Sequence, residues 1–433
     1  MFAYYLALAL RGMRRSRVLT GLMVLALGLG IGACMTTLTV YRVMSGDPIP
    51  SKSHRLFTPQ LDSDPMKGYT PDDELPEQMT RFDAEALLRE HHGVQQAVMT
   101  GGGFSIVPDQ PDLLPFFVDS RYTSADFFSM FDAPFEAGQG WTAADDEARA
   151  RVAVITTELA EKVFGKQPAV GRDIRIDEQV YRVVGVLKPW QLTPHFYDLN
   201  TSRFGNTEQV YVPFSTSREL KLSRNGSMTC HSEKSADPTA LASMCTWVQY
   251  WVQLDTAQQV SDYRQYLQGY AERQHAAGRF ERPARTALHD VMGWMTLKKV
   301  VPSDAELQVG VAFAFLLLCL VNTIGLLLAK CLRRAPEIGV RRALGASRRS
   351  IFLQFLVEAG VIGLLGGALG LLLSIGGLAL VRQSPSGVAK LAELDMTMLA
   401  LNFGLGLAAS VLAGLLPAWR ACQITPALQL KSS

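Results

Sequence analysis

Four long stretches of this sequence carry almost no charge, and they constrain the fold more than any other feature. Residues 18–41 and 396–419 each run for 24 residues without a charged side chain, residues 309–329 run for 21, and residues 351–381 are interrupted only by Glu358. A helix of about 20 predominantly apolar residues crosses the hydrocarbon core of a bilayer. The sequence therefore predicts a membrane protein with an α-helical bundle of four transmembrane helices.

The charge of the segments between these spans predicts the side of the membrane that each one faces. Residues 330–349 carry seven Lys/Arg against one acid, and residues 1–17 carry four Arg and no acid, whereas residues 382–395 balance two bases against two acids. Lys and Arg beside membrane spans are retained on the cytoplasmic side. We therefore expect both termini, including the tail 420–433, and the 330–349 segment in the cytoplasm. Residues 44–307 and the short 382–395 loop are then outside.

Residues 1–17 have the pattern of an amphipathic helix, with arginines opposite an apolar face. The residues of that apolar face are Phe2, Leu6, Leu10 and Met13. Two interpretations are open: a simple positively charged segment before the first span, or an interfacial helix lying along the inner leaflet. The sequence around Cys34 resembles a lipoprotein cleavage site, but the apolar run continues beyond it, so we expect an uncleaved span.

Residues 44–307, between the first two spans, predict a large mixed α/β domain. They hold 36 Asp/Glu against 26 Lys/Arg, a balance that argues against nucleic acid as a partner. Alternating apolar residues predict strands, and apolar residues at helical spacing predict helices. The expected strands are 152–155, 174–176, 180–187, 210–214 and 247–254, and the expected helices are 82–90, 122–131, 157–164 and 257–277. The glycine run 101–103 predicts a turn.

Residues 330–349 predict a short helix between the second and third spans. Pro336 and Glu337 suit the first turn of a helix, because a missing N–H costs nothing there and a carboxylate meets the positive end of the helix dipole. Gly345 can end this helix, and Ser347 can cap the helix that follows. A short helix that joins two spans beneath a membrane is a shape on which a soluble partner can push.

Several segments resemble one known family. The segment EIGVRRALGASRRSIFLQFLVEAGVIGLLGGALG, which begins at Glu337, is similar to the coupling segment and third span of MacB/FtsX-type ABC transporter permeases. YTSADFFSMF (122–131) and RVAVITTELAEKVFGKQPAVGRDIRIDEQVYRVVGVL (151–187) resemble the MacB-like periplasmic core domain. LPAWRACQITPALQLK (416–431) resembles the ending of the permeases.

This resemblance implies a permease subunit that binds no cofactor itself and works with a separate cytoplasmic ABC ATPase, which would bind ATP and Mg. It implies a bacterial inner membrane with its lipid, a dimer with a second copy or a paralogue, and a periplasmic adaptor with an outer-membrane channel. Coupling to the ATPase, and so the transmission of mechanical work, is implied for Pro336, Glu337, Ile338, Gly339, Arg341, Arg342 and Gly345.

Two classes of function follow from the resemblance. A MacB-like permease performs efflux of a peptide, an antibiotic or another amphiphile by moving its periplasmic domain. An FtsX-like permease instead regulates a cell-wall hydrolase and transports nothing. Lipoprotein release, as in the LolC/LolE relatives, stays open within the transport class. The large outside domain, residues 44–307, favours transport.

The sequence contains no recognisable catalytic motif. The phosphate-loop pattern GxxxxGK[ST] does not occur, because the only Gly-Lys pair, Gly165-Lys166, has Ala160 where the first glycine should stand. The patterns HExxH, GxSxG and CxxC do not occur either. We therefore expect no catalytic residues and no metal site, with ATP hydrolysis in a partner chain.

Two of the six cysteines, Cys230 and Cys245, fall in the segment predicted to lie outside the membrane. A periplasm is oxidising, and the other four cysteines fall in spans or on the cytoplasmic side, so we expect these two to form a disulfide. A metal cluster that includes His231 lacks a fourth ligand at a sensible spacing.

The third span contains one acid and several glycines. Glu358 lies eight residues beyond Ser350, or about 12 Å along a helix, near the inner interface. We interpret it as a carboxylate that pairs with the adjacent basic cluster or is hydrated at the boundary, in preference to a proton or substrate site. Close helix contact, inside the bundle or at a dimer axis, is predicted for Gly28, Gly32, Gly363, Gly366, Gly367 and Gly370.

We expect reporter fusions to show the predicted topology. A fusion at Ala150 should give alkaline phosphatase activity, which requires an oxidising compartment. Fusions at Val340 or after Ser433 should give fluorescence from a cytoplasmic fluorescent protein, because the basic segments hold these positions inside. Paired fusions at each position measure both signals. Cytoplasmic fluorescence at Ala150 would overturn the whole topology.

Overall fold

The chain folds into two compact units. One comprises Gly46–Val300, which we call the α/β domain, and the other comprises Met1–Ser45 with Val301–Ser433, which we call the helical unit. The computed structural model describes residues 2–108, 113–205, 207–231, 237–383 and 396–422. The predicted 382–395 loop and 420–433 tail therefore lie largely outside the described residues.

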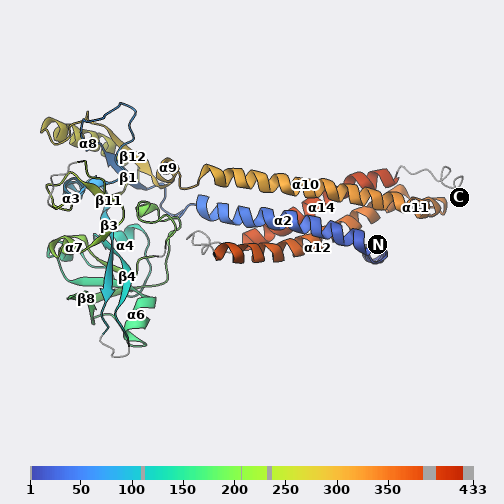
Figure 1. Ribbon diagram of the computed structural model, residues 1–433, viewed down its shortest axis with the longest axis horizontal. Coiled ribbons are helices and arrows are strands. Elements are labelled where there is room, and N and C mark those ends of the chain that lie inside the picture. The colour runs from blue at the N-terminus through green and yellow to red at the C-terminus, as the bar shows by residue number, and fades with distance from the viewer. Residues whose placement is uncertain (1, 109–112, 206, 232–236, 384–395, 423–433) are drawn as a thin grey trace. The chain divides into compact units, whose positions relative to one another are not determined.

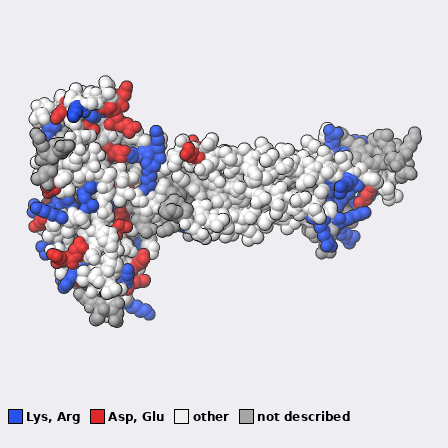
Figure 2. Space-filling view, in the orientation of Figure 1, with Lys and Arg blue, Asp and Glu red and all other residues white. Residues whose placement is uncertain are grey.

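The helical unit consists of long apolar helices and two shorter helices (Figure 1). Its elements are α1 (Phe2–Arg15), α2 (Arg17–Ser45), α10 (Ser303–Arg333), α11 (Ala335–Ala343), α12 (Arg348–Arg382) and α14 (Met396–Cys422). Among the described residues, four of these helices, α2, α10, α12 and α14, are long and apolar enough to cross a membrane. Figure 2 shows an uncharged belt along the bundle, with Lys and Arg gathered at one end.

The predicted fold class is confirmed: four long apolar helices, with a large mixed α/β domain between the first and the second. One boundary differs from the expectation. The outside domain was predicted to reach residue 307, but α10 already begins at Ser303. Asp304 and Glu306 lie in its first turn, where carboxylates are favoured by the helix dipole. A polar first turn therefore extends this helix beyond its apolar run.

Glycines allow α12 to approach α2 closely. A Cβ added at Gly370 would lie 2.9 Å from Cγ2 of Ile31, and one added at Gly366 would lie 2.9 Å from Cβ of Leu27. On α2, a Cβ at Gly32 would lie 3.2 Å from the Gly370 carbonyl oxygen. Because lipid provides little hydrophobic drive between helices, such close backbone contacts are a main source of their association.

An adjacent side of α12 contacts α14 in the same way. A Cβ at Gly363 would lie 2.8 Å from the carbonyl oxygen of Gly406, and Asn402 Nδ2 donates a hydrogen bond of 3.0 Å to the Gly367 carbonyl. Gly28 likewise contacts Leu369 of α12. The predicted packing glycines thus lie at contacts within one bundle.

A mixed sheet forms the frame of the α/β domain. Its path of neighbouring strands is β12-β1-β11-β3-β4-β9-β6-β8-β5, with β10 and β7 beside β3, β7 also beside β8, and β2 beside β11. The strands are β1 (Leu56–Leu61), β2 (Met79–Thr80), β3 (Gln95–Ile106), β4 (Phe116–Thr123), β5 (Phe135–Gly138), β6 (Val152–Thr156), β7 (Asp173–Ile176), β8 (Gln179–Leu187), β9 (Val210–Pro213), β10 (Arg224–Asn225), β11 (Thr246–Gln253) and β12 (Thr286–Asp290). The pairs β4–β9 and β6–β8 are parallel.

Short helices cover this sheet and complete two apolar cores. They are α3 (Arg81–Glu90), α4 (Phe127–Met130), α5 (Ala143–Glu147), α6 (Thr157–Phe164), the 3-10 helix η1 (Phe196–Asp198), α7 (Phe214–Glu219), α8 (Ala257–Ala276) and α9 (Val291–Leu297). All eight residues of β11 are buried. On one face of this strand, Trp247 belongs to one apolar core and Trp251 belongs to the other. Tyr250, on the opposite face, belongs to the same core as Trp247.

The predicted turn at residues 101–103 is wrong, because these glycines lie in the middle of β3. A Cβ at Gly102 would overlap the ring of Tyr122, and a Cβ at Gly103 would overlap the ring of Phe117, both on the neighbouring strand β4. Glycine in a strand often marks such a close approach. The glycine run therefore makes room for aromatic rings.

The predicted helix over residues 122–131 is also wrong in its first half. Tyr122 and Thr123 are the last residues of β4, and only Phe127–Met130 is helical. Tyr122 is held in the sheet by a hydrogen bond of 2.6 Å from its hydroxyl to the Ser223 carbonyl. This contact is distant in sequence, so no local pattern indicates it.

A disulfide joins Cys230 to Cys245, and Cys34 and Cys319 are free and buried. We expect peptide mapping of the full chain, alkylated under denaturing conditions without reductant, to find the disulfide pair unmodified and Cys34 and Cys319 alkylated. Closing a loop of this size stabilises a fold by about 3 kcal/mol. Replacing both cysteines with serine should therefore lower the free energy of unfolding by about this amount. Alkylation of Cys230 and Cys245 in the unreduced sample would contradict the expectation.

Candidate functional site

The helix α11 connects α10 to α12, and its ends follow the pattern that the sequence predicts. Pro336 and Glu337 lie in its first turn. Gly345, with φ of 96°, follows its end, and the Gly345 amide donates a hydrogen bond of 3.1 Å to the Arg342 carbonyl. Ser347 then caps α12 through its side-chain oxygen. The chain thus reverses between two long helices through one short, defined element.

One face of α11 is anchored by apolar contacts. Ile338 is buried, and its neighbour Gly339 is buried with it. The apolar cluster around Ile338 draws its other members from three long helices: Cys331 of α10, Ile351 and Phe355 of α12, and Ala418 of α14. A displacement of α11 must therefore move the ends of these helices or break this cluster.

Polar side-chain contacts of Arg341 and Glu337 also hold α11 in place. Arg341 Nη2 lies 2.6 Å from Glu337 Oε1 one turn earlier, and Arg341 Nη1 donates to Gln354 Oε1 of α12 at 3.2 Å. Glu337 Oε2 also lies 3.8 Å from Arg15 Nη1 of α1. The carboxylate of Glu337 thus contacts an arginine of α1 and an arginine of its own helix, α11.

The other face of α11 is open and partly apolar. Val340 is 54% exposed and Leu344 is 83% exposed. They lie four residues apart, so they share one side of the helix. An exposed apolar pair on a helix that is anchored to three membrane helices is a suitable contact for a soluble protein partner.

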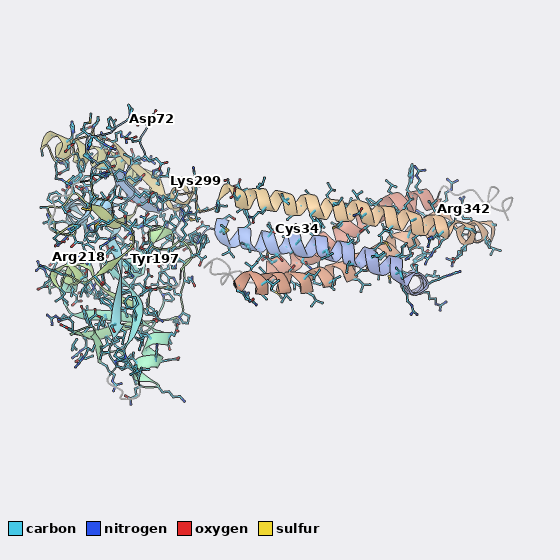
Figure 3. The ribbon with its side chains drawn as sticks, in the orientation of Figure 1. Cys34, Asp72, Tyr197, Arg218, Lys299 and Arg342 are labelled. Atoms are coloured by element: carbon cyan, nitrogen blue, oxygen red, sulfur yellow. A yellow bond between two sulfur atoms is a disulfide. The ribbon has the colours of Figure 1, made fainter. Side chains whose placement is uncertain are left out.

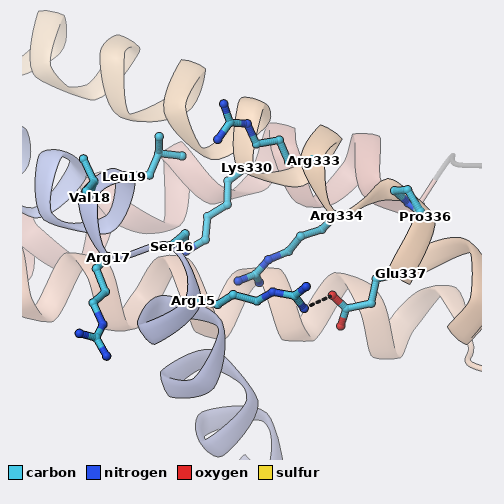
Figure 4. A pocket seen from close by; sticks show the side chains of 10 residues that line it. All are labelled: Arg15, Ser16, Arg17, Val18, Leu19, Lys330, Arg333, Arg334, Pro336 and Glu337. Carbon is cyan, nitrogen blue, oxygen red and sulfur yellow. Dashed lines mark ion pairs between the residues drawn. The ribbon is translucent and has the colours of Figure 1, made fainter.

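A pocket of about 730 Å³ opens beside this helix (Figure 4). Its lining comes from the α1–α2 junction, the end of α10 and the start of α11: Arg15, Ser16, Arg17, Val18, Leu19, Lys330, Arg333, Arg334, Pro336 and Glu337. Five of these residues are basic and one is acidic. The pocket is therefore strongly cationic.

Glu358 is 1% exposed, although it lies within α12. Its two carboxylate oxygens contact two bases: Oε1 is 2.5 Å from Lys330 Nζ, and Oε2 is 3.3 Å from Arg334 Nη1. Lys330 also donates to Thr20 Oγ1 at 3.2 Å, and Arg334 donates to the Gly12 carbonyl at 2.6 Å. We call this set the Glu358 cluster. It connects α1, α2, α10 and α12, and it shows Glu358 buried and paired with the adjacent bases.

The α/β domain contains a buried charge cluster that the sequence analysis did not identify. Arg121 Nη1 lies 2.6 Å from Asp198 Oδ2, and Arg121 Nε donates to Glu208 Oε1 at 3.0 Å. The Tyr197 hydroxyl donates to Glu208 Oε2 at 3.1 Å; Figure 3 labels Tyr197 in the interior of this domain. The two carboxylates lie 77 and 87 residues from Arg121 in sequence, so no local pattern could reveal them.

The electrostatics of this cluster favour the charged forms of Arg121 and Glu208. Burial alone would lower the pKa of Arg121, but the attraction of Glu208 and Asp198 outweighs burial and leaves this pKa above its ordinary value. Burial raises the pKa of Glu208, and the positive charge of Arg121 outweighs burial and leaves this pKa below its ordinary value. Buried charges that are paired and hydrogen-bonded in this way act mainly as structure.

Within the described part of the chain, no group of three or more His, Cys, Asp and Glu side chains could hold a metal ion. The predicted coupling residues come together on α11 and its end, whereas the disulfide pair lies in the other unit. The arrangement around α11 is suited to transmitting force and binding anions.

Two family patterns match this chain. The pattern described as "MacB-like periplasmic core domain" matches residues 20–270, and the pattern described as "FtsX-like permease C-terminal" matches residues 309–426. The second match contains α11, and the first contains most of the α/β domain.

Individual relatives are distant. The chain is 25% identical to the macrolide export ATP-binding/permease protein MacB of Wolinella succinogenes, over 72% of this chain and 43% of that protein. It is 26% identical to the pyoverdine export ATP-binding/permease protein PvdT of Pseudomonas aeruginosa, over 85% of this chain and 50% of that protein. It is also 26% identical to the uncharacterized ABC transporter permease YknZ of Bacillus subtilis, over 69% of this chain and 66% of that protein. The chain thus spans about half the length of the MacB and PvdT relatives.

We expect Glu358 to act structurally. Glu358→Gln leaves Lys330 buried without its counter-charge, which typically costs about 3–5 kcal/mol, so the thermal unfolding midpoint of the detergent-solubilised chain should fall. Lys330→Met/Glu358→Leu removes both buried charges and should restore most of the loss. A double variant as unstable as Glu358→Gln would contradict this. A stable double variant that fails to complement a deletion strain would instead identify a proton or substrate site.

Proposed function

We propose that this chain, which belongs to the family with a MacB-like periplasmic core domain and an FtsX-like permease region, is the membrane subunit of an ABC exporter. In this proposal a separate cytoplasmic ATPase binds ATP and Mg and hydrolyses the ATP. The chain passes the resulting movement from α11 through its long helices to the extracytoplasmic domain. The membrane is the bacterial inner membrane, with both termini inside.

One observation supports this proposal most strongly: α11 is a short helix held to the long helices on one face and open on the other. The Ile338 cluster and the Arg341–Gln354 hydrogen bond hold it to the bundle. Exposed Val340 and Leu344 leave it a surface for a partner. A push on the open face therefore acts on the long helices together, which is the mechanical requirement of a coupling helix.

Export is the direction that the relatives favour. Two of them are named exporters, of macrolides and of pyoverdine, so we propose a peptide, antibiotic or other amphiphile as the substrate class. Regulation of a cell-wall hydrolase is the alternative, and the match of the α/β domain to the MacB-like core domain favours export over it. A second permease copy or a paralogue, a periplasmic adaptor and an outer-membrane channel complete the proposed assembly.

We expect the tagged full chain, purified in detergent from its host, to bring down an ABC ATPase. Val340→Gln/Leu344→Gln should weaken this association by about tenfold or more, because apolar anchors dominate such interfaces. The measurements are the ATPase recovered per permease and the MgATP hydrolysis of the complex. Leu380→Gln, at an exposed site near the end of α12, is the matched control and should change neither.

Two results would contradict the proposal. One is ATP hydrolysis by the purified chain alone. The other is normal ATPase recovery and normal complementation by Val340→Gln/Leu344→Gln, which would move the contact away from α11. A thermal melt of each variant confirms that the helical unit is still folded.

A further inference from the structure

The sheet of the α/β domain is incomplete beside the first half of β4. The strand β3 pairs with β4 along its whole length, from Phe116 to Thr123, whereas β9 pairs with β4 only from Ser120 onward. Among the described residues, no strand pairs with residues 116–118 on the side of β9. The sheet therefore has a gap at this place, one strand wide, which we call the β4 notch.

Hydrogen bonds define the closed end of the β4 notch. The Gln209 amide donates to the Asp119 carbonyl at 2.9 Å, and the Thr156 amide donates to the Gln209 carbonyl at 3.1 Å. Two residues before Gln209, Thr207 Oγ1 donates instead to the Trp190 carbonyl at 3.0 Å. The chain that leads into β9 therefore contacts the loop around Trp190 first and joins the sheet only at Gln209.

The backbone of Phe117 is directed into the β4 notch. Backbone groups of successive strand residues point to alternate sides, and the Asp119 carbonyl points to β9, so the Phe117 amide and carbonyl do so too. Ser105, which lies opposite Phe117 on β3, uses its own backbone groups elsewhere. Its amide donates to Asp177 Oδ1 at 2.9 Å, and its carbonyl accepts from the Asp177 amide at 2.8 Å. An open donor and acceptor on a strand edge can pair with another chain.

A pocket of about 780 Å³ lies at the β4 notch. Its lining comes from residues 117–119 of β4, residues 156–158 at the start of α6, residues 189–191, Thr207 and Gln209. Pockets for small ligands typically enclose about 300–1,000 Å³, whereas protein partners bury about 800 Å² on each side. The size of this pocket therefore favours a short peptide over the surface of a folded protein.

The lining of this pocket is acidic and aromatic. Asp119 and Glu158 are exposed, and the described lining residues include no Lys, Arg or His. Phe117, which is 66% exposed, and Trp190 supply aromatic rings. Phe117 and Asp119 lie two residues apart and so share one face of the sheet. A strand in the notch would place its own side chains beside these two, so an apolar residue and a basic residue at the same spacing match them.

We propose that the β4 notch binds a short peptide in extended form, as an added strand. An apolar residue of the peptide lies beside Phe117, and a Lys or Arg two residues away lies beside Asp119 and Glu158. Residues 116–119 span about 13 Å of strand, which is enough for three or four peptide residues. The inference rests on the proposed function for the source of the peptide, which is then a transported substrate.

The test is a binding measurement on the full chain in a non-ionic detergent. The probe is a fluorescein-labelled peptide amide of sequence GFVRG, followed by fluorescence anisotropy. The peptide GFVEG, with the opposite charge, should bind about tenfold more weakly or worse. GFVRG with N-methylated backbone amides cannot donate hydrogen bonds to β4, and it should also bind about tenfold more weakly.

Variants of the chain separate the notch from general surface charge. Asp119→Asn/Glu158→Gln should weaken GFVRG binding by about tenfold, or about threefold for each charge. Glu161→Gln removes an exposed acid one turn further along α6, outside the pocket, and should leave the affinity unchanged. Asp119→Asn alone, with a loss of about threefold, serves if the double variant folds poorly.

A second measurement tests whether the peptide is a transported substrate. Unlabelled GFVRG should raise MgATP hydrolysis by the copurified permease–ATPase complex, and it should not do so with Asp119→Asn/Glu158→Gln. Binding without such stimulation would overturn the substrate role and identify the notch as a site for a segment of a partner protein.

The binding site itself is overturned by equal affinity for GFVRG and GFVEG, by wild-type affinity in the double variant, by an equal loss in Glu161→Gln, or by full affinity of the N-methylated peptide. The binding measurement needs no ATPase, so its failure would leave the permease proposal standing. Conversely, a failed ATPase copurification would leave a positive peptide result intact.

Discussion

Hydrocarbon offers no hydrogen-bond partner to the protein backbone, and this constraint decides the form of the membrane part of the chain. The four long helices satisfy their backbone groups internally, and close contacts such as Gly370 against Ile31 replace the hydrophobic drive that lipid cannot supply. The same constraint explains the Glu358 cluster. A carboxylate buried among helices is tolerated because Lys330 and Arg334 meet both of its oxygens.

The short helix α11 is restrained by this setting. It follows Arg334 directly, and Arg334 also belongs to the Glu358 cluster. Its apolar face then contacts the ends of three long helices, and Arg341 adds a polar contact to α12. Charge pairing at one end and apolar packing along one face therefore restrain the same element, while its other face stays accessible to a partner.

The sequence predicts what depends on neighbouring residues and misses what depends on distant ones. The spans and α11 follow from uncharged runs, Pro336 and Gly345, which act locally. The glycines 101–103 look like a turn because the rings that they accommodate belong to the next strand. The charges around Arg121 are likewise invisible, because folding alone brings them together from separate elements. The pairing of Glu358 was predictable, because Lys330 and Arg334 lie in the basic segment next to its span.

The edge of the sheet has a consequence for how the protein is made. The first strand of the α/β domain, β1, pairs with the last, β12, in a register that runs from Phe57 opposite Asp290 to Leu61 opposite Thr286. All six residues of β1 are buried in the finished domain. During synthesis β1 emerges first and stays unpaired, as an open strand edge prone to aggregation, until nearly the whole domain has been translated. The interval between the two strands is therefore the period in which the nascent chain most needs protection.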